Sequence, residues 1–395
     1  MPASKKPYNI SILGAGYVGL SLGVLLSEAN AVKIYDIDEE KVSCINSKKS
    51  PIRDGEIESF FQTKKLNIIS FTDVAKALQD AEITIIAVPT NFDDSLNSFD
   101  TSIVEECIAN ILIHAPESLV VIKSTVPIGF TNQIKLKHGL ERIIFSPEFL
   151  QEGTALRDNL FPSRIIIGGD PLIGSIFAEV LKKCSHLADP PILFMDSQSA
   201  EAVKLFANSY LAMRVAFFNE LDGYAMVNNL DAKSIIDGIC LDSRIGNFYN
   251  NPSFGFGGYC LPKDTQQLIS SFHGIPQNLI KATITANKER KQFIVEQIAL
   301  KNPNLIGVYK LAMKAGSDNF RFSSMLEIIQ DLKSKGFNII IFEPSIQEDQ
   351  FYECDVVNDL QEFISSSSII LSNRKDPDLM GAEDKIFTRD IFGNN

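Results

Sequence analysis

The sequence predicts an α/β protein in which two parallel-sheet domains are joined by a long central helix and an all-α region. Apolar strands alternate with helices through roughly the first half of the chain, and a stretch of about 30 residues from Ser199 reads as one helix. The strand–helix–strand rhythm returns after Asn304. Such alternation is typical of parallel sheets with helices on both faces.

The strands expected in the first part are short apolar runs. They are Asn9–Leu13, Val32–Asp36, Ile83–Val88, Leu119–Lys123, Ile143–Phe145 and Ile165–Gly168. A helix over Val18–Ser27 connects the first two.

The central stretch SAEAVKLFANSYLAMRVAFFNELDGYAMVNN contains no proline, and Gly223 is its one internal breaker. As a helix it would be about 45 Å long at ~1.5 Å per residue. The later runs LIGVY, SSMLEIIQDLKSKG, NIIIFEP and SIILSN indicate a second, smaller α/β domain. We therefore expect domains at residues 1–198, 199–300 and 301–395.

Composition argues against several partners. With 37 basic and 49 acidic residues among 395, the net charge is −12, which disfavours nucleic acid. The apolar runs fall far short of the roughly 20 residues of a membrane span, so no membrane partner is expected. The six cysteines are scattered without a CxxC pair, which indicates thiols in a reducing compartment, and we expect a cytoplasmic protein. Four histidines without HExxH or a Cys/His cluster predict no metal site.

The sequence GAGYVG follows the first strand and opens a helix, with glycines at Gly14, Gly16 and Gly19. Such glycines allow a tight turn, close approach of a pyrophosphate and close packing of helix on strand. Asp36 ends the second strand, 17 residues after Gly19, where an acid binds ribose hydroxyls and repels a 2′-phosphate. A tight turn with an incidental acid is the alternative, but the whole pattern favours a Rossmann-like domain that binds NAD.

The stretch GFGGYCLPKD, residues 255–264, predicts a reactive cysteine. Pro262 suits a first helical turn, so Cys260 is expected just ahead of a positive helix end and next to Lys263. Both features lower the pKa of a thiol. A buried structural cysteine is the alternative. We accept it for the other five cysteines, but a glycine-rich loop is a poor place to bury a side chain.

A nicotinamide fold with an activated cysteine indicates oxidation of an alcohol beyond the aldehyde. An aldehyde has no hydride to give until a nucleophile adds to it. A thiolate adds to form a thiohemiacetal, which loses hydride to become a thioester that water cleaves. The expected product is therefore a carboxylate.

At this point the chain resembles the UDP-glucose/GDP-mannose dehydrogenase family over nearly its whole length. The motifs that carry the resemblance are GAGYVG, VPT at 88–90, KSTVPIG at 123–129, FSPEFLQEGTA at 145–155, KLFANSYLAMRVAFFNE at 204–220, SRIG at 243–246, GFGGYCLPKD and MKAGSDNFR at 313–321. The resemblance implies an NAD domain, a helical dimerisation region and a C-terminal domain that binds the nucleotide of the sugar. It also implies a four-electron oxidation with two NAD⁺, and the chain looks most like the compact bacterial members that act on UDP-glucose.

The resemblance implies a role for particular residues. The catalytic set is Cys260 as nucleophile, Lys204 and Asn208 for the oxyanion, Asp264 and Thr125 near a catalytic water, Glu148 in thioester hydrolysis, and Glu152 near substrate and nicotinamide. Lys204 and Asn208 lie four residues apart and so share one helix face, although a lysine there could merely extend toward solvent.

Further residues match binding positions. Those for NAD are Gly14, Gly16, Tyr17, Val18, Gly19, Asp36, Lys41, Thr90, Thr125, Glu152 and Arg321. Those for the nucleotide sugar are Phe149, Leu150, Lys204, Asn208, Arg244, Phe248, Tyr249, Ser253, Gly257 and Lys314. Arg244 matches an arginine that reaches the neighbouring subunit's site, which implies a homodimer; an ordinary solvated charge is the alternative for Arg244 and Lys314.

The chain departs from the family in one segment. Many relatives carry FKPxTDDxR where this chain has AMKAGSDNFR, so Lys314 and Arg321 are kept but the proline is lost. The variant favours UDP-glucose and leaves the contacts to the base open. The alternatives are the same chemistry on GDP-mannose or UDP-N-acetylmannosamine, a two-electron hydroxyacid-type dehydrogenase, and a non-catalytic nucleotide-binding scaffold.

Overall fold

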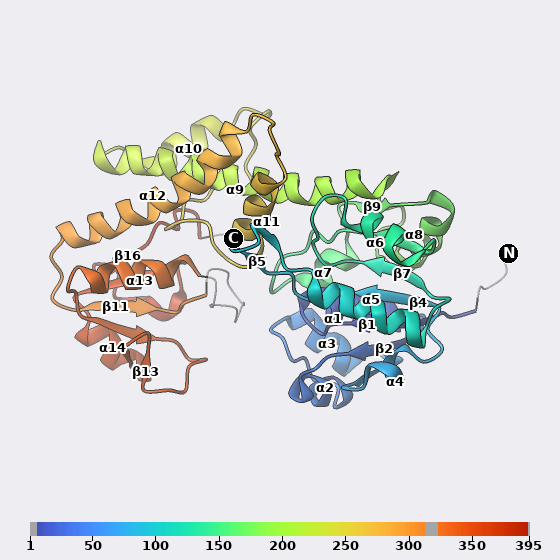
Figure 1. Cartoon of the computed structure of the whole chain (residues 1–395). Coiled ribbons are helices and arrows are strands. Elements are labelled where there is room, and N and C mark those ends of the chain that lie inside the picture. Colours follow the sequence, from blue (N-terminus) through green and yellow to red (C-terminus); the bar gives the residue numbers. More distant parts are fainter. Residues whose placement is uncertain (1–5, 313–322, 394–395) are drawn as a thin grey trace. The chain divides into compact units, whose positions relative to one another are not determined.

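The computed structural model describes residues 6–312 and 323–393. It contains two compact units, Met1–Phe206 and Ala207–Asn395, and each is built on its own sheet (Figure 1). The strands within each sheet are mainly parallel, and long helices link the two sheets along the chain, as the sequence predicts. None of the helices in the described ranges has the length and apolar character of a membrane span.

The sheet of the first unit has eight strands in the order β10-β9-β8-β7-β4-β1-β2-β3. They are β1 (Asn9–Leu13), β2 (Ala31–Tyr35), β3 (Ile68–Phe71), β4 (Ile83–Ile86), β7 (Leu119–Ile122), β8 (Ile143–Phe145), β9 (Ile165–Gly168) and β10 (Ile192–Met195). Neighbouring strands pair in parallel except β8 and β9, which are antiparallel. The expected ends are corrected in three strands: β2 ends before Asp36, β4 before Val88 and β7 before Lys123.

Helices cover both faces of this sheet. They are α1 (Tyr17–Ser27), α2 (Glu39–Asn46), α3 (Gly55–Thr63), α4 (Val74–Leu78), α5 (Ser102–His114), α6 (Phe130–His138), α7 (Ala155–Leu160) and α8 (Pro171–Cys184). One apolar core contains side chains of α1, α3, α7 and α8, and a second contains those of α5 and α6. A short hairpin, β5 (Phe92–Asp93) and β6 (Ser98–Phe99), follows β4.

Aspartates fix where several of these helices begin. Asp38, Asp54, Asp73 and Asp170 each precede a helix and accept hydrogen bonds from its first free amides.

Four helices follow the first sheet: α9 (Ser197–Val227), α10 (Ala232–Cys240), α11 (Cys260–Ser270) and α12 (Asn278–Leu300). Helix α9 has 31 residues and begins two residues before the predicted Ser199. Helix α11 begins at Cys260 itself, not after it as expected, because Pro262 is tolerated within a first turn, where an amide has no helical partner.

The second unit has a six-stranded sheet in the order β13-β14-β12-β11-β15-β16. Its strands are β11 (Ile306–Tyr309), β12 (Ile339–Phe342), β13 (Gln350–Phe351), β14 (Cys354–Val356), β15 (Ile369–Ser372) and β16 (Ile386–Phe387). Only β13 and β14 pair antiparallel among these. Helices α13 (Ser324–Ser334) and α14 (Leu360–Ser366) and the 3₁₀ turn Pro377–Leu379 complete it, and α12 and α13 pack on the sheet in one apolar core.

Candidate active site

The turn between β1 and α1 leaves no room for side chains at two of its three glycines. Gly14 has φ +106°, and a Cβ there would lie 2.4 Å from the carbonyl oxygen of Ala87. A Cβ at Gly19 would lie 1.9 Å from the carbonyl oxygen of Gly14. A Cβ at Gly16 would meet no protein atom within 4 Å. The space beside Gly16 is therefore open and could receive a ligand. Tyr17 and Val18 then lie in the first turn of α1, where free backbone amides can bind a phosphate.

Asp36 directly follows β2 and is held by the backbone. Its Oδ2 accepts from the amide of Ala15 at 2.7 Å, and its Oδ1 accepts from the amide of Asp38 at 3.0 Å. Lys41 lies 3.8 Å from Oδ2. Each carboxylate oxygen has more than one acceptor site, so the fixed group retains capacity for ribose hydroxyls. The glycine turn, the helix end and this acid together fit NAD.

Thr90 and Thr125 lie in the loops that follow β4 and β7. Both are buried, and the Oγ1 of Thr90 donates to the carbonyl oxygen of Thr125 at 2.7 Å. The structure therefore brings these two predicted cofactor positions together at the carboxyl edge of the sheet, where ligands bind in open α/β sheets.

Glu148 and Lys204 form a buried ion pair. The Nζ of Lys204, on α9, donates to Glu148 Oε1 at 2.6 Å and to the carbonyl oxygen of Glu148 at 2.9 Å. Burial alone would raise the pKa of Glu148, but Lys204, the amide of Leu150 and Lys123 outweigh it, so the pKa is lowered and the carboxylate is charged. Lys204 is buried, which argues against a lysine that extends toward solvent.

Lys123 is a second buried lysine beside this pair, and the sequence analysis assigned it no role. Its Nζ donates to Ser146 Oγ at 3.3 Å and to the carbonyl oxygen of Pro147 at 3.1 Å. Burial lowers the pKa of Lys123 to about 8. The negative charge of Glu148 opposes this shift, and the positive charge of Lys204 adds to it. A charged residue directly after a buried strand was the available signal.

The loop after Glu148 carries three more predicted residues. The amide of Leu150 donates to Glu148 Oε2 at 2.9 Å, and the guanidinium of Arg164 lies 3.6 Å from the ring centroid of Phe149. Glu152 lies half-buried in the same loop. Lys123, Glu148, Phe149, Leu150 and Arg164 line a cavity of about 270 Å³. Arg164 had no part in the sequence prediction.

In the second unit, a glycine-rich loop leads into α11 and places Cys260 at the helix N-terminus. The side chain of Asn287, on α12, accepts from the amide of Phe256 at 2.7 Å and donates to its carbonyl oxygen at 2.8 Å. Gly255 has φ +147°, and a Cβ there would lie 3.0 Å from Asn287. Cys260 is the first residue of α11 and is half-buried. A thiol at a helix N-terminus gains stabilisation of its thiolate form.

Other cysteines lie in apolar surroundings. Burial raises the pKa of Cys107 to about 12 and that of Cys184 to about 11, and it raises the pKa of Cys354 as well. All six cysteines fall in the described ranges and carry thiols rather than disulfides.

Asn208 and Asp264 meet inside the second unit. The Nδ2 of Asn208, on α9, donates to Asp264 Oδ2 at 2.6 Å, and both side chains are buried. Lys263 lies 3.0 Å from the other carboxylate oxygen of Asp264 and 4.7 Å from the ring centroid of Tyr259. The positive charge of Lys263 is therefore paired with the carboxylate of Asp264. Lys263 is also close in sequence to the thiol of Cys260.

Five predicted sugar-binding residues of this unit, Arg244, Phe248, Tyr249, Ser253 and Gly257, lie in the segment between α10 and α11. Arg244 is exposed and forms a bidentate pair with Asp242. Phe248 is 64% exposed, and Tyr249 has a positive φ of +50°. The Oγ of Ser253 accepts a hydrogen bond from Asn219 Nδ2 at 3.4 Å. Gly257 lies in the glycine-rich loop, and Lys314 and Arg321 lie outside the described residues.

Arg214, on α9, holds this segment and was missed by the sequence analysis. It is buried and donates to the carbonyl oxygens of Phe248 at 2.6 Å and Gly246 at 2.8 Å. An arginine within an apolar helix was its only sequence signal.

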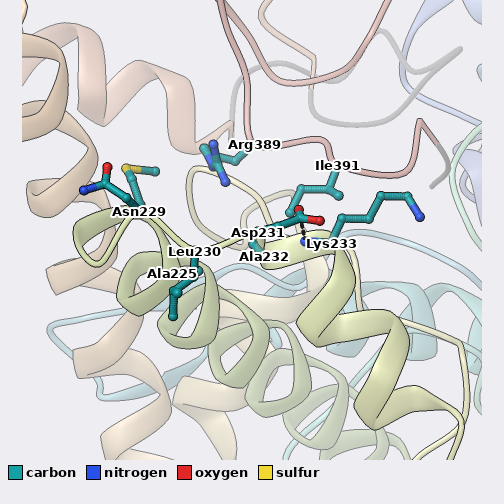
Figure 2. A pocket seen from close by; sticks show the side chains of 9 residues that line it. Ala225, Asn229, Leu230, Asp231, Ala232, Lys233, Arg389 and Ile391 are labelled. Carbon is teal, nitrogen blue, oxygen red and sulfur yellow. Dashed lines mark hydrogen bonds between the residues drawn. The ribbon is translucent and has the colours of Figure 1, made fainter.

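A separate hollow of about 330 Å³ lies in the second unit between the end of α9, the start of α10 and the C-terminal segment (Figure 2). Both of its basic residues are ion-paired within the unit: Arg389 binds the buried Asp222, which also binds Arg290, and Lys233 binds Asp237. The hollow contains none of the predicted site residues.

Comparisons with known proteins agree on one family. Models of the UDP-glucose/GDP-mannose dehydrogenase family match residues 8–182 (NAD binding domain), 198–289 (central domain) and 307–389 (UDP binding domain). The chain is 47% identical over 390 residues to a UDP-glucose 6-dehydrogenase of Streptococcus pneumoniae, covering 97% of this chain and 99% of that one. It is 47% identical to a UDP-glucose 6-dehydrogenase of Campylobacter jejuni, covering 97% and 98%. A UDP-glucose dehydrogenase structure from Pyrobaculum islandicum superposes with a TM-score of 0.87 at 25% identity, covering 100% and 96%.

Proposed function

The chain belongs to the UDP-glucose/GDP-mannose dehydrogenase family, and we propose that it oxidises the 6-hydroxyl of UDP-glucose to a carboxylate, giving UDP-glucuronate. Two relatives at 47% identity over nearly the full chain carry that activity in their names. The observation that carries the chemistry is a half-buried cysteine at the start of α11, after a glycine-rich loop.

The glycine turn and Asp36 would hold NAD⁺, and two NAD⁺ molecules, bound one after the other, would each take up one hydride. The residues of this chain do the rest. In the first oxidation a proton leaves the alcohol as its hydride departs, which gives the aldehyde. The Cys260 thiolate then adds to the aldehyde carbon, and the resulting thiohemiacetal loses a proton and a second hydride to become a thioester.

Water cleaves the thioester in the last step. It adds to the carbonyl carbon and gives up a proton, the C–S bond breaks, and the electron pair leaves with the sulfur of Cys260. Glu148 is proposed to accept the proton of this water. Lys204 and Asn208 are proposed to stabilise the oxyanion that forms in each covalent step, Asp264 and Thr125 to order the catalytic water, and Glu152 to lie near substrate and nicotinamide.

We propose that residues 1–198 bind NAD, residues 199–300 carry the nucleophile and the dimer contacts, and residues 301–395 bind the nucleotide. Phe149, Leu150, Phe248, Tyr249, Ser253, Gly257 and Lys314 are proposed to contact the sugar nucleotide, and Tyr17, Val18, Lys41, Thr90 and Arg321 to contact NAD. A cytoplasmic location fits the six thiols.

A homodimer is proposed from the surface of α9. Tyr210, Phe217 and Tyr224 are 53%, 57% and 65% exposed, and they recur every seven residues, so they line one face of the helix. Large apolar side chains left exposed along one helix face support a contact surface there. The exposed Arg244 is proposed to reach the partner's active site.

A substrate panel tests the proposal. Purified protein is given NAD with UDP-glucose, GDP-mannose or UDP-N-acetylmannosamine, and NADH is counted per sugar consumed. Two NADH per UDP-glucose are expected, because both hydrides leave the same carbon. One NADH per sugar would contradict the thioester route, and preference for another nucleotide sugar would contradict the substrate.

Replacing the nucleophile separates catalysis from binding. Cys260→Ala is expected to lower acid formation by a factor of about 10³ or more, while NAD still binds, because the glycine turn and Asp36 are untouched. Cys107→Ala, which removes a buried thiol of raised pKa, is the matched control and should keep its activity. Normal UDP-glucuronate formation by the Cys260 variant would refute the assignment.

A further inference from the structure

Lys123 has no part in the proposed function, yet it is buried directly behind the loop that carries Glu148. It follows the last residue of β7 and is 6% exposed. Its ammonium group donates to Ser146 Oγ and to the carbonyl oxygen of Pro147. Burying an ammonium group is strongly unfavourable unless hydrogen bonds and opposite charges compensate for the lost hydration. A buried lysine in this position therefore indicates that its charge or its hydrogen bonds have a function.

Lys123 and Lys204 hold successive carbonyl groups of one loop. Lys123 binds the carbonyl oxygen of Pro147 at 3.1 Å, and Lys204 binds that of Glu148 at 2.9 Å. The two lysines come from separate elements, the end of β7 and helix α9. The backbone from which the Glu148 side chain extends is thus anchored twice.

The same three side chains form a charge cluster with two cations and one carboxylate. Lys204 contacts Glu148 directly at 2.6 Å, and Lys123 adds a second positive charge that also favours the ionised carboxylate. The ring of Phe177 lies 5.9 Å from Lys123 Nζ, and Asp158 and Arg164 are the other charged residues that line the adjoining cavity. Removing Lys123 would leave only Lys204 and the amide of Leu150 to hold Glu148 charged and in place.

On the basis of the proposed function, we propose that Lys123 is a positioning residue for the hydrolytic step. It fixes the Pro147–Glu148 backbone and supplies the second positive charge beside the Glu148 carboxylate. Glu148 then stands ready to take the proton of the water that attacks the thioester. Lys123 itself forms and breaks no bond with the substrate.

Lys123→Met tests the role, because methionine keeps an unbranched chain but removes the charge and the donor. We expect kcat to fall by about 10- to 100-fold, while KM for NAD and for the nucleotide sugar change by less than about threefold. Lys123→Arg should recover much of the activity, since a guanidinium group keeps the charge and the donors. Lys182→Met is the matched control and should leave kcat unchanged, because Lys182 lies on α8 with a side chain that is 37% exposed and paired with Asp189.

The hydrolytic step has its own signature. In Lys123→Met the thioester on Cys260 should accumulate, so that a rapid burst of two NADH per site precedes slow turnover. Intact-protein mass spectrometry after acid quench would show the adduct. Wild-type kcat in Lys123→Met, raised KM values with an unchanged kcat, or a Lys123→Arg variant no better than Lys123→Met would each overturn the proposal.

Hydrogen exchange tests the anchor without turnover, and so separates this proposal from the choice of substrate. Amides of residues 148–152 should exchange faster in Lys123→Met than in wild type and Lys123→Arg. Unchanged exchange would overturn the anchoring role whatever the substrate is. If the methionine variant does not fold, Lys123→Gln, which keeps a donor without the charge, replaces it in each measurement. Failure of wild type on UDP-glucose alone would overturn the substrate assignment and not the role of Lys123.

Discussion

Single residues of the first unit show how a sequence pattern becomes a binding geometry. The glycine turn needs Gly14 and Gly19 for packing, because a Cβ at either would collide with backbone. A Cβ at Gly16 would meet no protein atom within 4 Å, so packing does not require a glycine there, and we expect the open space to be used by the ligand. Asp36 is then held by two backbone amides at a fixed place beside the same turn. Fold and function thus use different members of one motif.

Asp36→Ala is expected to weaken NAD binding about 10-fold or more, because a charged hydrogen-bonding partner of the ribose is lost. The apparent KM for NAD should rise, and kcat at saturating NAD should change little. Titration of NAD by initial rate and by fluorescence quenching measures both effects.

Asp73→Ala is a matched control for Asp36. Asp73 also accepts two backbone amides, those of Ala75 and Lys76, but it does so at the start of α4, outside the site. Its replacement should lower the free energy of unfolding by about 1 kcal/mol without a change in NAD affinity. Equal NAD affinity in the Asp36 variant and wild type would remove the ribose role.

At the scale of elements, buried strands were predicted well because their character is local. The bounds of β1, β8 and β9 match the expected ones, since a strand buried on both faces reads as a continuous apolar run. Their direction is not local: the antiparallel pairing of β8 with β9 leaves no trace in apolar runs of this kind. The long helix was likewise clear from the absence of breakers.

Partners across long distances were out of reach of the sequence. Glu148 and Lys204 were both named as candidates, but their contact joins residues 56 positions apart, as does that of Asn208 and Asp264. Lys123, Arg214 and Asn287 were missed because their function lies in the backbone groups they bind, and no spacing rule connects them to those groups. Family motifs identified residue types, whereas the structure identifies which of them touch.

Asn287 offers a test of how α12 supports the cysteine loop. Asn287→Ala leaves the amide and carbonyl of the buried Phe256 without their side-chain partner, which should lower the free energy of unfolding by about 1–3 kcal/mol. Because Phe256 lies four residues before Cys260, we also expect kcat and the rate of thiol alkylation to change. Chemical denaturation and iodoacetamide kinetics measure these effects.

Asn228 is the matched control for Asn287. It is exposed and directly follows α9, and its side chain donates to the carbonyl oxygen of Tyr224 in the last turn of that helix. Asn228→Ala should change the free energy of unfolding by less than about 0.5 kcal/mol. It should leave the rate of thiol alkylation unchanged. An Asn287 variant that behaves like this control would show that the loop keeps its shape without α12.

At the scale of the whole molecule, α9 carries catalytic candidates of both compact units. Lys204 belongs to the cluster of the first unit and Asn208 to that of the second, one helical turn further along. The same helix presents Tyr210, Phe217 and Tyr224 to solvent. A single long helix thus connects the two clusters of catalytic candidates and the proposed dimer surface, which is why we expect activity to depend on assembly.

The dimer surface is tested by Phe217→Glu, which places a charge in the middle of the aromatic stripe. The variant should have the mass of a monomer by light scattering and a lower activity than wild type, because burying an unpaired charge in an interface costs several kcal/mol. Leu136→Glu, on α6, replaces a lone exposed leucine and should leave the mass unchanged. A wild type that is monomeric and fully active would contradict the proposed assembly.

Mixing two impaired variants tests whether Arg244 acts in the partner's site. Cys260→Ala and Arg244→Ala chains are unfolded together, refolded and assayed at low sugar nucleotide. If Arg244 acts across the interface, each mixed dimer contains one site with both a cysteine and an arginine, and about a quarter of wild-type activity should return for random pairing in a twofold dimer. If Arg244 acts within its own chain, no mixed dimer has an intact site and the mixture stays at the mean of its parents. The outcome decides whether the catalytic unit is one chain or two.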